Sequence, residues 1–411
     1  MTSRERVVAA WQGRPADYVP FTTWCFGFRA PPGRLWDRDG VPRRFWYSLR
    51  MEHLHTLPQP WTLEDDFRRV RAWRELGLDD VLEVSVPWSV DRAVSYRDRT
   101  APAGELDERY DVLVRDYETA DGPLQHAIRR TGEDPGEGWV VQPDHVPLFE
   151  DYNIPRGARH AVAGPADVSK VGHLYCPPDD SACRGFRERC NEVSRFAEAE
   201  GVAVQAWAGF GMDAVVWLAG VEGAILLAMD SPPAFRSLMD IVSEADLARI
   251  RLAAETPGVD AVVVRGWYSS TDLWSPSLFD EYVGPYLRRV ADAVHGHGKT
   301  FIYTMTTGVE QLGTKLADAG VDVLYFVDPV QDTITLERAR DLLGSRLTLV
   351  GGINSTSLQS DSVDRIREEV CRAVETLKPT GRFILHPVDA LFPDTPWDGL
   401  VAAIEAWKEC R

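Results

Sequence analysis

The sequence contains few cysteines and no long apolar run. Six cysteines among 411 residues are too few for a disulfide framework, and none of them forms a C-x-x-C pair. No apolar stretch approaches the roughly 20 residues that a membrane helix needs. The charged opening MTSRERVVAAWQGR lacks the apolar segment of a signal peptide. These absences predict a cytoplasmic protein that has no membrane partner.

Basic residues are also scarce relative to acidic ones. The chain has 45 Lys and Arg against 63 Asp and Glu, which gives a formal charge of −18. Such a charge repels phosphate backbones and anionic lipid surfaces, so no nucleic acid is expected as a partner. An anionic small molecule would need local arginines that outweigh this field. The apolar content of 44% is enough for a large core within one domain.

Short apolar runs followed by helical segments recur along the chain. Such runs, rich in Val, Ile, Leu and Phe, are typical of parallel strands that are buried on both faces. Eight of them are predicted as strands: residues 17–21, 81–86, 202–207, 261–264, 300–304, 323–326, 347–350 and 382–385. The predicted fold is therefore of the α/β class, a (β/α)₈ TIM barrel that forms a single domain over residues 1–411. Residues from about 94 to 176 include segments of alternating polarity and predict an inserted β-hairpin and loop region over the barrel mouth.

Polar residues end several of these strands, and the chemistry of such barrels is located at the C-terminal ends of the strands. The strand-end residues are Arg265, Met305, Asp328, Asn354, His386 and Asp389. The Arg265 guanidinium suits either a substrate carboxylate or a structural aspartate. His386 and Asp389 could pass a proton between them. The alternatives are a histidine bonded to the backbone and an aspartate that caps the next helix.

Aromatic side chains near the strand ends are candidates for pocket walls. They are Trp207, Tyr268 and Tyr303. Core packing is the commoner role of aromatic residues at such positions, and it remains the alternative for all three.

Six segments carry a resemblance to a known family. They are SRERVVAAWQGRPADYVP, AGFGMDAVVWLAGVEG, SPSLFDEYVGPYLRRV, GVDVLYFVDP, GGINSTSL and FPDTPWDGLVAAIEAW. In order and spacing they resemble the uroporphyrinogen decarboxylase superfamily, whose other branch consists of zinc-dependent methyltransferases that act with corrinoid proteins. The resemblance covers nearly the whole chain. It implies a barrel enzyme that forms a homodimer.

The decarboxylase branch implies several site residues. Its substrate clamp has two arginines where this chain has Cys25 and Arg29, so half of the clamp is replaced. Ser269 matches the active-site serine of the family, Trp217 takes the place of its tyrosine, and Asp389 takes the place of its late histidine. The essential aspartate of the family has no match in LEVSVPWSV. A substrate other than uroporphyrinogen is therefore expected.

The methyltransferase branch implies a zinc site with the pattern H-x-C-G and a late cysteine. This chain has Met305, Thr306, Thr307 and Gly308 at the first position and Asp389 at the second. A thioether, hydroxyls and one carboxylate do not form a tetrahedral zinc site. Neither a metal nor an organic cofactor is expected.

The leading hypothesis is a metal-independent decarboxylase that acts on a carboxylated small molecule. Decarboxylation needs a cation that orients the carboxylate and an acid that protonates the carbanion. The expected catalytic residues are Asp389, His386 and Arg29. Substrate binding is assigned to Arg265, Ser269, Asn354, Asp328, Tyr268, Trp207, Tyr303 and Trp217. A methyltransferase of the corrinoid-linked branch and a non-catalytic binding barrel are the alternatives.

Overall fold

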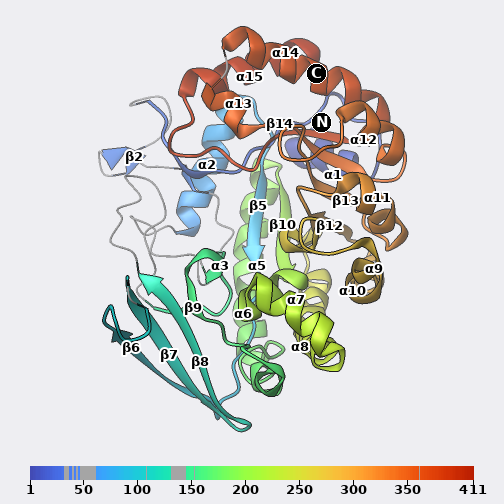
Figure 1. Cartoon of the computed structure of the whole chain (residues 1–411). Coiled ribbons are helices and arrows are strands. Elements are labelled where there is room, and N and C mark those ends of the chain that lie inside the picture. The colour runs from blue at the N-terminus through green and yellow to red at the C-terminus, as the bar shows by residue number, and fades with distance from the viewer. Residues whose placement is uncertain are drawn as a thin grey trace.

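The structure is a computed structural model. It describes residues 1–31, 37–38, 41–42, 45–46, 62–107, 109–130, 145–151, 153–360 and 362–411. A curled parallel sheet of seven strands forms the centre, in the order β15-β14-β13-β12-β11-β10-β5 (Figure 1). These strands are β5 (Val81–Ser85), β10 (Ala203–Gly209), β11 (Ala261–Val264), β12 (Thr300–Thr304), β13 (Val323–Val327), β14 (Thr348–Asn354) and β15 (Phe383–Val388). Seven of the eight predicted strands are therefore confirmed, with small differences at their ends.

The eighth position of the barrel is taken by an extended segment rather than by a full strand. Residues 20–22 lie between the two edges of the sheet, where Leu385 N–H donates to Pro20 O at 2.9 Å and Thr22 N–H donates to Leu385 O at 3.1 Å. On the other side, Asp79 N–H donates to Phe21 O at 2.9 Å, just before β5. Pro20 has no N–H, so the ladder cannot continue through it. The predicted strand at 17–21 is thus shortened to a single bridge that closes the barrel.

Helices surround the outside of the sheet, as expected for βα units (Figure 1). The helices that link or flank the barrel strands are α1 (Ser3–Trp11), α2 (Leu63–Glu75), α5 (Asp180–Glu200), α6 (Met212–Ala219), α7 (Val221–Asp230), α8 (Pro232–Glu255), α9 (Pro276–Leu278), η3 (Phe279–Val283), α10 (Gly284–His295), α11 (Val309–Asp318), α12 (Leu336–Leu343), α13 (Ser355–Ser360), α14 (Val363–Leu377) and α15 (Trp397–Cys410). Short 3-10 turns are η1 (Pro165–Asp167), η2 (Trp267–Ser269) and η4 (Lys378–Thr380).

Helix α5 shows how local sequence sets the boundaries of an element. The Asp179 carboxylate accepts a hydrogen bond from Ala182 N–H at 2.9 Å and caps the first turn. Gly201 ends the helix with φ 65°, a left-handed conformation that glycine adopts without steric cost. The chain then turns directly into β10, so the helix packs on the strand that follows it.

The predicted insertion forms a separate antiparallel sheet beside the barrel (Figure 1). Its strands are β6 (Ser95–Ala101), β7 (Asp111–Thr119), β8 (Gly122–Arg130) and β9 (Gly157–Arg159), in sequential order. The hairpin between β7 and β8 confirms the alternating pattern of the sequence. The helices α3 (Asn153–Arg156) and α4 (Val168–Val171) follow in this region. Four more short strands, β1 (Phe26–Phe28), β2 (Asp37–Arg38), β3 (Val41–Pro42) and β4 (Phe45–Trp46), lie after the closing segment.

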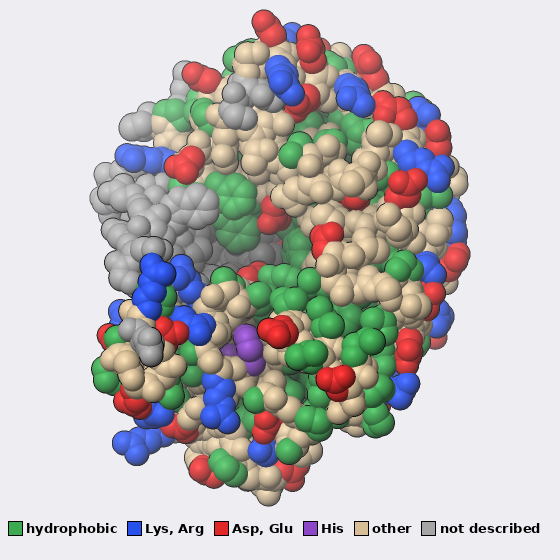
Figure 2. Space-filling model, viewed as in Figure 1, with side chains coloured by type: hydrophobic (Ala, Val, Ile, Leu, Met, Phe, Trp, Pro, Cys, Tyr) green, Lys and Arg blue, Asp and Glu red, His purple; other side chains and the backbone are tan. Residues whose placement is uncertain are grey.

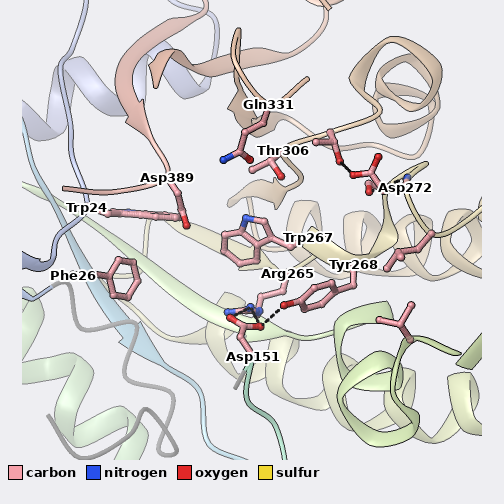
Figure 3. A pocket seen from close by; sticks show the side chains of 14 residues that line it. Trp24, Phe26, Asp151, Arg265, Trp267, Tyr268, Asp272, Thr306, Gln331 and Asp389 are labelled. Carbon is pink, nitrogen blue, oxygen red and sulfur yellow. Dashed lines mark hydrogen bonds and ion pairs between the residues drawn. The ribbon is translucent and has the colours of Figure 1, made fainter. Parts of the chain in front are cut away.

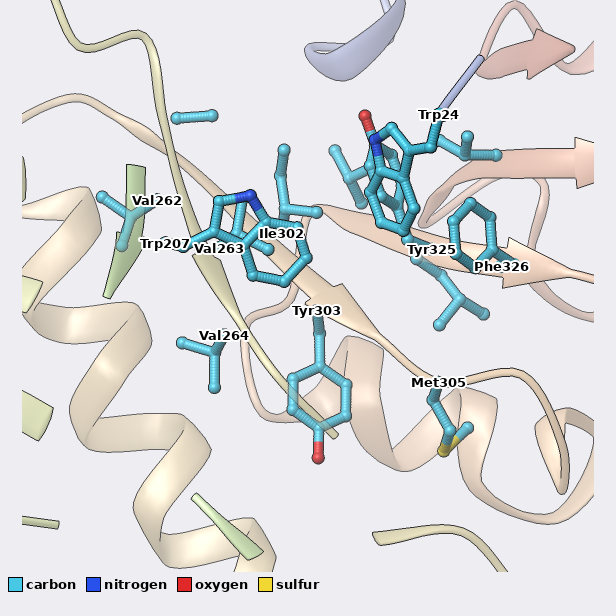
Figure 4. Close-up of a cluster of buried hydrophobic side chains, with 14 of the residues drawn as sticks. Trp24, Trp207, Val262, Val263, Val264, Ile302, Tyr303, Met305, Tyr325 and Phe326 are labelled. Atoms are coloured by element: carbon cyan, nitrogen blue, oxygen red, sulfur yellow. The ribbon is translucent and has the colours of Figure 1, made fainter. Parts of the chain in front are cut away.

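Large side chains fill the barrel interior below its mouth. Trp24 packs edge-on against Tyr325 and Phe326, with ring centroids 5.7 and 4.9 Å apart, and lies 5.6 Å from Trp207 (Figure 4). Burial of each such ring contributes on the order of 2–3 kcal/mol. One glycine is required by this packing, because a Cβ on Gly351 would lie 2.3 Å from Val327 O and its φ is 134°. The strands β13 and β14 can therefore approach closely at the mouth.

All six cysteines are free. Among the described residues, no single helix is long and apolar enough to span a membrane. Helices α6 and α7 reach the necessary length and apolar composition only together, and the pair is bent by 103°.

Replacement of Trp407 by alanine should destabilise the barrel where it closes. Trp407 is fully buried, its Nε1–H donates to Val19 O at 2.8 Å, and its ring meets Phe21 edge-on. We expect the free energy of unfolding, measured with urea, to fall by about 3–5 kcal/mol. Met229→Ala, at a side chain that is 63% exposed, is the control and should change it by about 0.5 kcal/mol or less. A loss below about 1 kcal/mol for Trp407→Ala would show that this contact does not secure the closure.

Candidate active site

A cavity of about 470 Å³ opens at the C-terminal ends of the barrel strands. The molecular surface is hollowed at this place, with acidic and apolar side chains around the hollow (Figure 2). The residues that line the cavity are Trp24, Phe26, Asp151, Val221, Arg265, Trp267, Tyr268, Ser270, Asp272, Leu273, Thr306, Thr307, Gln331 and Asp389 (Figure 3). Three residues of the predicted site are among them, namely Arg265, Tyr268 and Asp389.

Arg265 follows β11 and provides the positive charge of the cavity wall. Its Nε–H donates to Asp213 at 3.2 Å, and its Nη2 donates to both oxygens of Asp151 at 3.1 Å. The guanidinium also lies over the rings of Trp217 and Trp267, at 4.6 and 4.3 Å from their centroids. Cation–π contacts of this kind add to the two ion pairs. The structure thus shows the structural pairing that the sequence left open for Arg265, and contact of this side chain with a substrate stays a prediction.

Asp213 is the buried partner of Arg265. Its second oxygen accepts a hydrogen bond from Tyr268 N–H at 2.9 Å, so it holds the turn after β11 as well as the arginine. Burial raises the pKa of Asp213 to about 7, and the nearby Arg265 charge opposes this rise. The carboxyl is positioned by α6, within the segment AGFGMDAVVWLAGVEG.

Asp389 is a cavity carboxyl that has no hydrogen-bond partner among the described residues. Its Oδ1 is buried, and its side chain makes no hydrogen bond to any residue that the structure describes. Burial raises the pKa of Asp389 to about 6, and the charge of Asp151 adds to the rise while Arg265 opposes it. Near neutral pH such a carboxyl exchanges protons readily, which is the property of a general acid or base.

Aromatic rings form the walls around Asp389. Trp24, Phe26 and Trp267 face the cavity (Figure 3). Trp207 lies one layer deeper, where it stacks on Trp267 at 6.0 Å with nearly parallel planes and donates its Nε1–H to buried Glu83 at 2.6 Å. Trp207 was predicted to bind substrate, but it instead supports the ring that lines the cavity.

Asp328 and Asn354 form a buried pair behind the cavity. Asn354 Nδ2 donates to Asp328 at 2.7 Å, and the other Asp328 oxygen accepts from the backbone N–H groups of Val330 and Gln331 at 2.8 and 3.2 Å. Burial raises the pKa of Asp328. The pair thereby shapes the turn that presents the Gln331 amide to the cavity (Figure 3). Both residues were predicted to bind substrate, and the structure places them where they position another residue.

Ser269 and Tyr303 also lie beneath the cavity surface. Their hydroxyl oxygens are 2.6 Å apart, and Ser269 donates to Gly266 O at 2.7 Å. Neither side chain is among the described cavity-lining residues. Trp217 is fully buried and donates Nε1–H to Asp151 at 3.0 Å. These three predicted binding residues are therefore one layer away from the cavity in the present arrangement.

The other two predicted catalytic residues are apart from the Asp389 carboxyl. The His386 ring is buried under Trp24, and its Nδ1 lies 3.0 Å from Thr22 Oγ1. Burial lowers the pKa of His386 to about 3, so the ring is neutral. No hydrogen bond joins its ring to the side chain of Asp389 within the described structure. Arg29 is exposed and is absent from the described cavity lining; its role stays a prediction.

The donor set at the expected zinc positions does not fit zinc. Met305 is buried in the core, and Thr307 Oγ1 donates to Asp272 at 2.5 Å. In the described part of the chain, no group of three or more His, Cys, Asp or Glu side chains is arranged to hold a metal ion. The residues present thus lack the thiolate and imidazole ligands that a structural or catalytic zinc requires.

Several cavity residues were missed by the sequence analysis. Asp151 lies in the inserted region, where the strand-end rule does not apply. Trp24 and Phe26 follow the closing segment and carry no pattern that separates them from core aromatics. Trp267 stands two residues after Arg265, and this proximity was a usable signal. Gln331 is brought in by a turn whose shape depends on Asp328 and Asn354.

A cavity at the mouth of a parallel α/β barrel, with charged side chains from several strand ends, is typical of barrel enzymes. A family model described as Uroporphyrinogen decarboxylase (URO-D) matches residues 149–410. The chain belongs to the uroporphyrinogen decarboxylase family. The resemblance stated from the sequence is thereby confirmed.

Two known proteins show how far this likeness reaches. A uroporphyrinogen decarboxylase from Dichelobacter nodosus is 26% identical over 156 residues, which is 37% of this chain and 41% of that protein. The match spans less than half the length of that relative. A methyltransferase from Methanosarcina mazei superposes with a TM-score of 0.56 and 18% identity, covering 100% of this chain and 99% of the other. At such identity the structural likeness shows a common fold.

Neutralisation of Asp389 should stabilise the protein in a pH-dependent way. A carboxyl whose pKa is higher in the folded state than in the unfolded state binds more protons when folded, so its contribution to stability falls as the pH rises from about 4 to 6. Asp389→Asn should therefore increase the free energy of unfolding by about 1–3 kcal/mol at pH 8 and leave it nearly unchanged at pH 4. Urea titrations at both pH values measure this difference.

Asp272→Asn is the matched control for this experiment. Asp272 lines the same cavity, but it is an exposed residue at the rim of the cavity. We expect its effect on the free energy of unfolding to be similar at pH 4 and pH 8. Equal effects of Asp389→Asn at the two pH values would contradict a raised pKa for Asp389.

Proposed function

We propose that the protein decarboxylates a carboxylated small molecule by acid and base catalysis, with Asp389 as the proton donor. The observation that carries this proposal is the Asp389 carboxyl, which has no hydrogen bond from any described residue and faces a cavity that also contains the Arg265 guanidinium (Figure 3). Membership in the uroporphyrinogen decarboxylase family supports the same type of reaction.

Arg265 supplies the group that orients the substrate. Its Nε and Nη2 are engaged with Asp213 and Asp151, whereas Nη1 makes no hydrogen bond to any described residue. A substrate carboxylate can accept a charge-assisted hydrogen bond from Nη1. The two tryptophan rings that enclose the guanidinium keep it in one orientation, so the carboxylate is held at a defined place relative to Asp389.

Loss of CO₂ breaks the bond between the carboxylate carbon and its neighbouring carbon. The electron pair of that bond is delocalised into an electron-accepting group of the substrate next to the neighbouring carbon, and that carbon then takes a proton from the Asp389 carboxyl. Asp389 is left as a carboxylate and regains its proton from water. The aromatic walls limit the access of water to the reacting carbon, which favours loss of the charged carboxylate group. Each of these steps uses side chains of this chain, and none requires a cofactor.

The cavity suits a small or medium substrate with few carboxylates. Its volume is about 470 Å³, and Arg265 is the cationic side chain among the described lining residues, whereas Asp151, Asp272 and Asp389 are acidic. A tetrapyrrole with many carboxylates would meet repulsion from these three aspartates. A substrate with one carboxylate and an apolar or aromatic body matches the walls formed by Trp24, Phe26 and Trp267.

The proposal is tested by incubating the purified protein with a mixture of carboxylated metabolites in D₂O. Mass spectrometry should detect a compound that loses the mass of CO₂ and gains one deuterium on carbon. Once this substrate is known, Asp389→Asn should lower kcat by about 10²–10⁴-fold with a small effect on KM, because the acid acts in the transition state. Asp272→Asn, at the cavity rim, should change kcat by only a few fold.

Other outcomes of the same screen would overturn the proposal. A product that differs from its precursor by one methyl group, with no CO₂ released, would show methyl transfer instead. A ligand that binds and is recovered unchanged from every incubation would show a binding protein. Full turnover by a correctly folded Asp389→Asn variant would remove Asp389 from the role of the proton donor.

A further inference from the structure

The Asp151 carboxylate occupies a site that has the form of a carboxylate receptor. Arg265 Nη2 donates to both of its oxygens at 3.1 Å, and one oxygen also accepts from Tyr268 Oη at 3.0 Å and from Trp217 Nε1 at 3.0 Å. The Arg265 and Tyr268 side chains converge on Asp151 in Figure 3. Donors from three different residues, one of them charged, form the usual arrangement for recognising a carboxylate.

The receptor is held in place by groups other than Asp151. Asp213 binds Arg265 Nε and the backbone N–H of Tyr268 from behind. The rings of Trp217 and Trp267 enclose the guanidinium. Arg265, Asp213 and Trp217 are all buried, so these contacts are shielded from solvent. The Arg265 and Trp217 donors therefore keep their positions when the Asp151 side chain is not present, and the backbone of Tyr268 stays fixed by Asp213.

Asp151 itself is able to leave the receptor by a side-chain rotation. Its side chain is 50% exposed. The backbone on either side is anchored, because Phe149 is fully buried in an aromatic cluster and Asn153 Nδ2 donates to Pro147 O at 2.7 Å. Rotation of an exposed side chain takes place in picoseconds to nanoseconds and needs no movement of the surrounding fold.

We infer that Asp151 is an internal stand-in for a ligand carboxylate, and that the carboxylate of the substrate enters the site of Arg265, Tyr268 and Trp217 by exchanging with it. The ligand class is a monocarboxylate whose body is aromatic or apolar, because the adjoining walls are Trp24, Phe26 and Trp267. This inference rests on the proposed function and deepens it, since it places the substrate carboxylate on Nη2 of Arg265, Tyr268 and Trp217, within reach of the same guanidinium whose Nη1 has no partner among the described residues.

The exchange makes the site selective. An occupant that is part of the same chain competes at a high effective concentration, so a simple carboxylate binds weakly to the unmodified protein. A true substrate replaces Asp151 because its body gains additional contacts in the cavity.

The test measures binding of benzoate, a small aromatic monocarboxylate, by calorimetry at pH 7.5. Asp151→Ala should bind benzoate about tenfold or more tightly than the unmodified protein, because the internal competitor is gone. Asp272→Ala is the matched control. It removes one negative charge from the same cavity but leaves the receptor occupied, so any gain in its benzoate affinity should be several fold smaller than the gain in Asp151→Ala. The double variant D151A/R265Q should not show the tighter benzoate binding of Asp151→Ala, because the Arg265 guanidinium is no longer present.

Each result decides the inference. Equal gains in benzoate affinity in Asp151→Ala and Asp272→Ala would show a general effect of charge and would overturn the inference. An unchanged benzoate affinity in a folded Asp151→Ala protein would overturn it as well. Circular dichroism checks folding. If Asp151→Ala does not fold, Asp151→Asn keeps an acceptor oxygen for Tyr268 and Trp217, and it should bind benzoate several fold more tightly than the unmodified protein. An unchanged affinity in that variant would overturn the inference as well.

The binding test is independent of the proposed reaction. Benzoate needs to bind and does not need to react. Tighter binding to Asp151→Ala together with a failed search for CO₂ release would therefore reject the decarboxylase and retain the exchange. If instead a substrate releases CO₂ while Asp151→Ala and the unmodified protein bind benzoate equally well, the decarboxylase is retained and the exchange is rejected.

Discussion

The positive charge of Arg265 is buried at the mouth of the barrel, and the arrangement of the site depends on its neutralisation. A buried guanidinium without partners would cost several kcal/mol. Asp213 meets it from α6, Asp151 meets it from the inserted region, and two tryptophan rings cover its faces. The insertion is thereby joined to the barrel at the place where the cavity opens.

The charges of these ion pairs also affect the pKa of Asp389. Asp389 shares the cavity with Asp151, and it has the Arg265 charge nearby but no hydrogen bond from a described group. Burial and the Asp151 charge together outweigh the effect of Arg265, so the pKa of Asp389 is raised to about 6. An inserted segment far away in the sequence thus tunes a carboxyl at the end of the last barrel strand.

Part of the predicted site lines the cavity, and the residues that do not line it share one physical reason. Rules based on strand ends led to Arg265 and Asp389, because parallel strands in a barrel all end at the same rim. The same rules also selected Trp207, Tyr303 and Asn354, which lie one layer below the cavity. Each strand carries several residues near its end, and an apolar run that is buried on both faces gives no signal for which of them reaches the cavity and which lies one layer deeper.

The amino-acid sequence by itself determined the parallel strands, the hairpin of the insertion and the family, since these follow from local periodicity and from motifs in order along the chain. Closure by residues 20–22, the approach of Asp151 to Arg265 and the isolation of the Asp389 carboxyl were decided only by the tertiary structure. These features join residues that are distant in sequence. Their free energy depends on burial and on the distance between charges, and neither quantity exists before the chain has folded.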